Sequence, residues 1–254
     1  MKNKIVILIA LFLTIITFGQ ERKTVFPIGL FNSPNKDIYG LSVGLAQKKV
    51  EPDWETTKSN GIRIEPFGRG FSIFFTPRIG LPKEESKFES YFNRKPTEIV
   101  NGINVSGGTL SFIDINGVSV SGGIQALRKM NGISISGFGN YSYKINGIQL
   151  AVSGSSTYQL RGVLLAYLGS YVLDGKGVQI SGFNDFKRFK GLQIGVWNDV
   201  DAKSEKFEGI QIGILNNTKS LRGIQIGLWN KNERRSLPFI NWQFSKKKVK
   251  SKTT

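Results

Sequence analysis

The chain has 254 residues, a formal net charge of +17, no cysteine and no histidine. Without cysteine it cannot build a disulfide framework, and without histidine it lacks the commonest metal ligand and the commonest general base. Its thirty glycines and many β-branched residues favour strands and tight turns over helices. We therefore expect an all-β protein.

Residues 1–19 have the pattern of a secretory signal peptide. Lys2 and Lys4 precede an apolar run over residues 5–18, and Gly19 is a small residue at the expected cleavage point. The run is shorter than the roughly 20 residues that a helix needs to cross a bilayer. The sequence therefore predicts export, with the outer membrane or the cell surface as the destination and the periplasm as an alternative.

Residues 20–96 contain two segments that resemble the later repeats without sharing their period. These are "YGLSVGL" at residues 39–45 and "NGIRIEPFGRGFSIFF" at residues 60–75. They predict two or three strands, followed by a loop over residues 82–96 bounded by prolines. We interpret residues 20–96 as an N-terminal β module or cap.

A nine-copy repeat of about 15 residues occupies residues 97–244. A glycine opens each copy, and successive glycines are 14, 15 or 18 residues apart: Gly102, Gly117, Gly132, Gly147, Gly162, Gly177, Gly191, Gly209 and Gly223. After each glycine apolar and polar residues alternate with the two-residue period of a strand. Only the glycine is common to all nine copies. Because glycine tolerates positive φ, we predict that these glycines form the corners of the repeat.

The equal spacing favours a β-solenoid, in which each copy forms one coil and stacks on the next at about 4.8 Å. The two aliphatic residues of each copy, such as Ile224 and Ile226, are expected to face the interior. A second corner is expected at Asn184, Asn198, Asn216 and Asn230, where the side chains could form a hydrogen-bonded ladder.

The alternative architecture is an up-and-down antiparallel outer-membrane β-barrel, with a porin-like function. Asn-Gly links suit hairpins, and "LPFINWQF" ends on an aromatic residue, Phe244. However, a membrane strand needs about 9 to 11 residues, and barrels alternate short turns with long loops. The short apolar segments and equal links of this chain favour the solenoid.

The end of the repeat region has the features of a cap. Pro238 falls fifteen residues after Gly223, in the position of a corner glycine. Because proline cannot donate to a strand ladder, a strand that contains it is a suitable last strand. We expect a cap strand to end at residue 244 and a basic tail to occupy residues 245–254.

The sequence contains no nucleotide-binding loop, zinc-protease motif or calcium loop, so we expect no catalytic, cofactor or metal site and no enzyme. A carbohydrate-active enzyme with a carboxylate pair formed in space is a minor alternative. The candidate binding residues form an aromatic and amide stripe on the expected outer face: Phe138, Phe183, Trp197, Trp229, Gln179, Gln193, Gln211 and Gln225. The alternative is that the aromatic rings cover glycines such as Gly195 and Gly227.

The "GxQIGxxN" repeats and the closing "R-x-LP-x-x-NW-x-F" resemble those of the surface repeat proteins of Gram-negative bacteria, most closely over residues 191–244. That resemblance implies export and a place at the cell surface or outer membrane. We expect a non-enzymatic protein with a structural, adhesive or binding role. The positive charge favours an anionic lipid or glycan surface, other cell envelope components or another surface protein as partners, and no nucleic acid. The sequence leaves the oligomeric state open.

Overall fold

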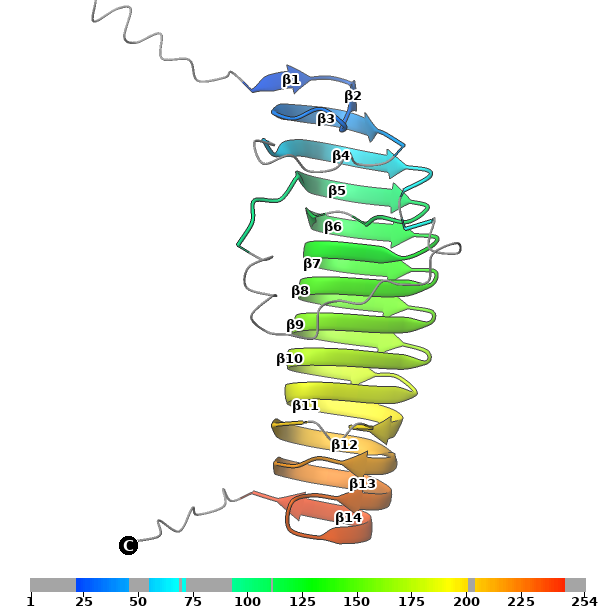
Figure 1. The fold of residues 1–254 in the computed structure, drawn as a ribbon, viewed down its shortest axis with the longest axis vertical. Coiled ribbons are helices and arrows are strands. Elements are labelled where there is room, and N and C mark those ends of the chain that lie inside the picture. The colour runs from blue at the N-terminus through cyan, green and yellow to red at the C-terminus, as the bar shows by residue number, and fades with distance from the viewer. Residues whose placement is uncertain are drawn as a thin grey trace, which may run out of the picture.

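The computed structural model describes residues 22–45, 55–68, 70–71, 93–110, 112–200 and 204–244. The predicted signal peptide, the basic tail and most of the expected loop over residues 82–96 lie outside these ranges. Figure 1 shows the described strands stacked in coils along one axis, from β1 at one end to β14 at the other.

All fourteen described strands belong to one sheet. In chain order they are β1 (Lys23–Val25), β2 (Ile28–Leu30), β3 (Lys36–Val43), β4 (Thr57–Glu65), β5 (Glu98–Ser106), β6 (Ile113–Ser121), β7 (Gln125–Ser136), β8 (Gly139–Ala151), β9 (Gly154–Ala166), β10 (Gly169–Ile180), β11 (Phe183–Asn198), β12 (Lys206–Asn217), β13 (Leu221–Lys231) and β14 (Ser236–Gln243).

Consecutive coils pair in parallel and in register. From β3 to β13 each corner glycine lies opposite the next, and Ile210 of β12 lies opposite Ile224 of β13. Antiparallel hairpins cannot produce this pattern, and β1 and β14 lie at opposite ends of the strand order. The predicted all-β solenoid is confirmed. The barrel alternative is wrong, and the porin-like function loses its structural basis.

Each corner glycine bends a continuous strand. The nine repeat glycines, together with Gly40 and Gly61, have φ between 106° and 151°. A Cβ atom at Gly191 would lie 1.9 Å from the carbonyl oxygen of Gly177, the corner residue of the preceding coil. The tight stacking of corners therefore requires glycine both for its backbone conformation and for the space that it leaves.

The hydrophobic core differs from the sequence expectation. The aliphatic residues one and three positions after each glycine point outward, and the core is built from the apolar residue two positions before the glycine. This inner row consists of Val100, Ile115, Met130, Ile145, Leu160, Phe189, Phe207 and Leu221, each 3% exposed or less. Residues two before and two after the glycine share one side of the strand, as simple alternation requires. The expectation that Ile224 and Ile226 face the interior is therefore wrong.

The two ends of the stack are built differently. At the N-terminal end β4 pairs with β5 across the expected boundary at residues 96 and 97, so the N-terminal β module continues the same sheet. At the other end β14, which contains Pro238, runs antiparallel to β13. This reversal ends the parallel ladder and leaves an irregular edge, which protects against edge-to-edge association.

Replacing a corner glycine tests the stacking directly. We expect Gly191→Ala to lower the free energy of unfolding by about 3 kcal/mol or more, because it adds strain at positive φ to a backbone clash. The measurement is urea unfolding followed by circular dichroism.

Gly154→Ala is the matched control. A Cβ atom there has no neighbour closer than the carbonyl oxygen of Gly169 at 3.5 Å. This variant should be neutral or more stable by up to about 1 kcal/mol. Equal destabilisation of the two variants would contradict the proposed role of the corners.

Candidate binding surface

The four glutamines assigned to the surface stripe lie inside the solenoid. Gln179, Gln193, Gln211 and Gln225 each follow a corner glycine by two residues, and all four are fully buried. They cannot contact a ligand on the outside. The amide half of the predicted stripe is therefore wrong. It assumed that the aliphatic residues on either side of each glutamine face the interior, whereas the glutamines occupy the inward side of the strand.

The buried amides satisfy one another along the rod. Gln193 Nε2 donates to Gln179 Oε1 at 2.8 Å, Gln211 Nε2 donates to Gln193 Oε1 at 2.8 Å, and Gln225 Nε2 donates to Gln211 Oε1 at 2.9 Å. At the cap, Asn241 Nδ2 donates to Gln225 Oε1 at 3.2 Å. A buried amide without a partner would be costly, so this ladder requires the coils to remain in register.

A second ladder confirms the expectation for the asparagines. Asn184 Nδ2 donates to Asn198 Oδ1 at 2.8 Å, and the same contact joins Asn198 to Asn216 at 2.6 Å and Asn216 to Asn230 at 2.7 Å. These four residues are at most 1% exposed. The ladder runs inside the turn edge of the solenoid.

The outward residues form a continuous apolar surface, which we call the aliphatic face. It comprises the residues one and three positions after the eleven corner glycines: Leu41, Val43, Ile62, Ile64, Ile103, Val105, Val118, Val120, Ile133, Ile135, Ile148, Leu150, Val163, Leu165, Val178, Ile180, Leu192, Ile194, Ile210, Ile212, Ile224 and Ile226. Ten of them are 37–46% exposed, and the others are partly exposed. In-register pairing aligns them in two rows that extend for about 50 Å at the usual strand spacing.

The end strands extend this face. In β2, Ile28 and Leu30 lie opposite Leu41 and Val43 of β3. In β14, Trp242 and Ile240 lie opposite Ile224 and Ile226 of β13, and both are about half exposed. Near the middle, a shallow groove of about 260 Å³ runs across the face, with Leu150, Leu165 and Tyr167 among its lining residues. No charged side chain belongs to the two rows.

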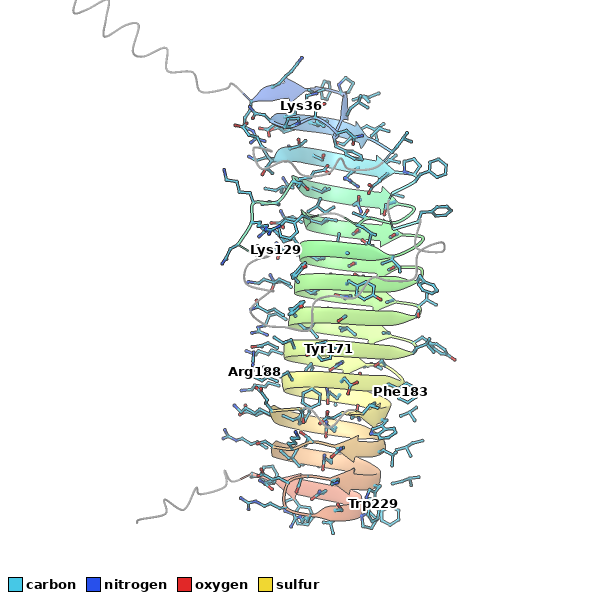
Figure 2. All side chains as sticks on the ribbon, in the orientation of Figure 1. Lys36, Lys129, Tyr171, Phe183, Arg188 and Trp229 are labelled. Carbon is cyan, nitrogen blue, oxygen red and sulfur yellow. The ribbon has the colours of Figure 1, made fainter. Side chains whose placement is uncertain are left out.

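The predicted aromatic residues lie at the turns that border the aliphatic face. Phe138, Phe183 and Trp229 are 46–50% exposed, whereas Trp197 is partly buried. Figure 2 shows Phe183 and Trp229 on one edge of the rod, with Lys129 and Arg188 on the opposite edge. Three of the four predicted aromatic residues are thus exposed, at the turns beside the aliphatic rows.

The alternative role for these rings, as covers for Gly195 and Gly227, stays a prediction, but the inward side of both glycines adjoins the asparagine ladder. A Cβ atom at Gly195 would meet Asn184 Nδ2 at 2.5 Å, and one at Gly227 would meet Asn216 Nδ2 at 2.7 Å. These two glycines therefore make room for the buried asparagine ladder. The aromatic rings are not among the atoms nearest to either position.

A charged cluster inside the N-terminal coils was not predicted from the sequence. Arg63 is fully buried, and its guanidinium binds Glu98 Oε2 at 2.9 Å, Glu65 Oε2 at 3.0 Å and Asn104 Oδ1 at 2.8 Å. Its Cζ atom also lies 4.0 Å from the centre of the Phe31 ring. The only sequence feature that could have indicated its burial is its position two residues after Gly61. This position faces the interior in every coil, which becomes clear only when the inward side of the strand is known.

Burial and mutual attraction act in opposite directions on the pKa values of this cluster. Burial raises the pKa of the Glu98 carboxyl, although Arg63 and Ser59 oppose this shift. For Arg63 burial disfavours the charge, but Glu98 and Glu65 together raise its pKa. The cluster contains two carboxyls and only one guanidinium. Its net charge is therefore closest to zero when Glu98 carries a proton.

Comparison of the chain with protein-family models, with curated proteins and with solved structures found no match. In the part of the chain that the structure describes, no three acidic, histidine or cysteine side chains are grouped as a metal site. Over the same ranges, no helix is long and apolar enough to cross a membrane.

Interrupting the glutamine ladder should destabilise the fold. We expect Gln193→Leu to lower the free energy of unfolding by about 2–4 kcal/mol, because Gln179 loses a donor and Gln211 loses an acceptor, both in the interior. Gln159→Leu, at a partly exposed position on the polar side of the coil, should change it by less than about 0.5 kcal/mol. Chemical denaturation of both variants measures the difference, and a neutral Gln193→Leu would show that the ladder contributes little.

The Glu98 carboxyl should make stability depend on pH. Its folded-state pKa is above the ordinary value of 4.5, so the native state binds the extra proton. The contribution of this proton to the free energy of unfolding is complete below the unfolded-state pKa. It is lost as the pH rises through the folded-state pKa. The free energy of unfolding should therefore fall less steeply with rising pH in Glu98→Gln than in the parent chain.

Glu208→Gln is the comparison variant, because Glu208 should affect the pH dependence of the free energy of unfolding in the opposite direction. A hydrogen bond from Lys206 lowers the pKa of Glu208. Its contribution is present above the unfolded-state pKa and is lost as the pH falls. Denaturation series across the acidic range measure both effects. If the profile of Glu98→Gln coincided with that of the parent chain, protonation of Glu98 would play no part.

Proposed function

We propose that the chain is an exported, non-enzymatic repeat protein of the cell surface or outer membrane, which acts as a structural or binding protein through its aliphatic face. The observation that carries this proposal is the face itself. Monomeric soluble proteins rarely expose a contiguous apolar patch of more than a few hundred Å². Two aliphatic rows along the whole length of the described rod are better explained by a contact surface than by folding.

Export and location rest on the sequence. Residues 1–19 have the pattern of a signal peptide, and the repeats resemble those of bacterial surface repeat proteins. The envelope partners that suit the face are a lipid surface or another surface protein. The net charge of +17 also suits an anionic glycan, but nucleic acid is not expected in an exported location.

A binding role accounts for the carboxylates better than catalysis does. Glu65 and Glu98 are brought together by Arg63, but both are at most 1% exposed. A glycoside substrate cannot reach them, although such an enzyme needs two carboxyls flanking the scissile bond. The surface carboxylate of Glu208 is engaged by the cation Lys206 at 2.7 Å.

Cell fractionation tests the proposal. The parent chain should be recovered with the cell envelope, and the double variant Ile212→Gln/Ile226→Gln should move at least about tenfold toward the soluble fraction, because each glutamine makes the face costly to bury. Both side chains are about 40% exposed, so the fold should tolerate them; thermal unfolding checks this.

Leu45→Gln is the matched control, since Leu45 is an exposed aliphatic residue outside the strands. This variant should remain with the envelope. Recovery of the parent chain in the cytoplasm would overturn export. An unchanged distribution of the double variant would overturn the role of the face.

A further inference from the structure

We propose that the C-terminal half of the aliphatic face, over β9 to β14, docks on the surface of an anionic lipid bilayer, with the cations along its edge binding lipid phosphates. This inference rests on the proposed function, because it names the partner of the same surface. Three features of β9 to β14 support it: a row of cations, a row of aromatic rings and a cationic pocket at the cap.

The cations occupy the position directly before the corner glycine. In β5 to β8 this position holds asparagine, but from β9 onward it holds Arg161, Lys176, Lys190 and Arg222, all exposed. Each is separated from the first aliphatic row by the glycine alone. The row therefore borders the apolar rows along their length, the arrangement by which peripheral proteins combine apolar insertion with attraction to anionic headgroups.

One carboxylate interrupts this row. Glu208 lies 3.7 Å from Lys190 and 3.8 Å from Arg222, whose side chains are 65% and 60% exposed. Ion pairs this exposed and this long are weak and exchange readily for other anions. Lys176 has no ion-pair partner among the described residues. Arg161 pairs with Asp174 at 3.0 Å, with side chains 44% and 36% exposed. The rest of the row retains positive charge, at Lys176 above all, that an anionic surface can neutralise.

The opposite edge carries aromatic side chains in the same coils. Tyr167, Phe183 and Trp229 are 78%, 49% and 50% exposed. Phe183 and Trp229 lie on the edge of the rod that is opposite Arg188 (Figure 2). Tyrosine and tryptophan are enriched at membrane–water interfaces because they combine an apolar ring with a polar group. Aliphatic rows with cations on one edge and aromatic rings on the other form an amphipathic surface suited to that interface.

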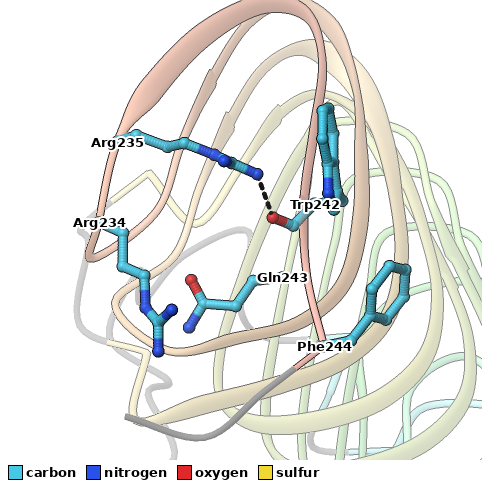
Figure 3. Close-up of a pocket in the computed structure, with 5 residues that line it drawn as sticks. All are labelled: Arg234, Arg235, Trp242, Gln243 and Phe244. Atoms are coloured by element: carbon cyan, nitrogen blue, oxygen red, sulfur yellow. Dashed lines mark hydrogen bonds between the residues drawn. The ribbon is translucent and has the colours of Figure 1, made fainter.

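The cap adds a pocket where cations and the aliphatic face meet. The pocket, of about 460 Å³, is lined by Arg234, Arg235, Trp242, Gln243 and Phe244 (Figure 3). Arg235 donates to the carbonyl oxygen of Trp242 at 2.7 Å, and its Cζ atom lies 4.6 Å from the centre of the Trp242 ring. Trp242 extends the first aliphatic row beyond Ile224. A phospholipid whose phosphate binds these two guanidiniums would have its acyl chains beside the aliphatic face.

Area and charge favour a bilayer over a second copy of the chain. Two rows about 50 Å long bury on the order of 500 Å² per partner, below the roughly 800 Å² of a standard stable interface. Two chains of net charge +17 also repel each other, whereas anionic lipid attracts them. A glycan is disfavoured because the aliphatic rows present no hydrogen-bonding side chain.

Vesicle co-sedimentation of the purified full chain tests the inference. Phosphatidylcholine vesicles containing phosphatidylglycerol should bind at least about tenfold more tightly than phosphatidylcholine alone, and added salt should weaken the binding. Lys176→Gln/Arg222→Gln should lose about tenfold or more on the anionic vesicles. The control Lys58→Gln/Lys129→Gln, which removes the same charge three residues before the glycine in β4 and β7, should bind like the parent.

The double variant Ile212→Gln/Ile226→Gln separates this inference from the proposed function. It should lose binding to anionic vesicles. If the parent chain bound no vesicles but sedimented as a dimer that this variant dissociated, the lipid inference would be overturned while the face remained a contact surface. Equal losses in the two charge variants would also overturn the inference, because net charge rather than the edge row would then control binding.

Discussion

The structure depends on the parallel, in-register stacking of buried amides. Gln193 and Gln211 are fully buried, and an unpaired buried amide is costly, so each takes its partner from the neighbouring coil. That partner is within reach only when successive coils are one strand spacing apart and aligned residue on residue. The glycine corners make this alignment possible, because Gly209 can stack on Gly191 only without a side chain. The glutamine ladder and the corner glycines therefore require the same register between successive coils.

The amide ladder also explains why the aliphatic residues are outside. In a strand that alternates Ile-Gln-Ile, one set must face the interior, and the inward position is shared with the apolar residue before the glycine, such as Phe207. The interior of these coils therefore contains both apolar side chains and amides, while Ile210 and Ile212 lie at the surface. The resulting rod exposes apolar side chains where most soluble proteins expose polar ones, which gives it a surface suited to an apolar partner.

Much of the fold could be predicted from the sequence, because the spacing of the corner glycines is a property of the chain itself. The solenoid, its corners and the asparagine ladder followed from that spacing. The orientation of Gln225 did not, because Ile224 and Ile226 were expected to face the interior, which placed Gln225 outside. The burial of Arg63 was missed for the same reason. An arginine between two isoleucines is expected to be exposed until the inward side of the strand is known. Phe138, Phe183 and Trp229 are at the surface as expected, whereas Trp197 is partly buried, and the aliphatic face beside them was assigned to the core.

The position before the corner glycine changes from asparagine to cations at Arg161 in β9, one coil before the buried glutamine ladder begins at Gln179 in β10. In the N-terminal coils an exposed ladder joins Asn101, Asn116 and Asn131 beside the glycines, and the interior polar row is mainly serine. From β10 to β13 the interior row is glutamine and forms one ladder, so the register of these coils does not depend on an exposed ladder. Cations stacked at the strand spacing repel one another and weaken the sheet. Lys176 and Arg222 lie in coils that the glutamine ladder joins, so the ladder can offset their repulsion, and their exposed charges remain available to an anionic partner.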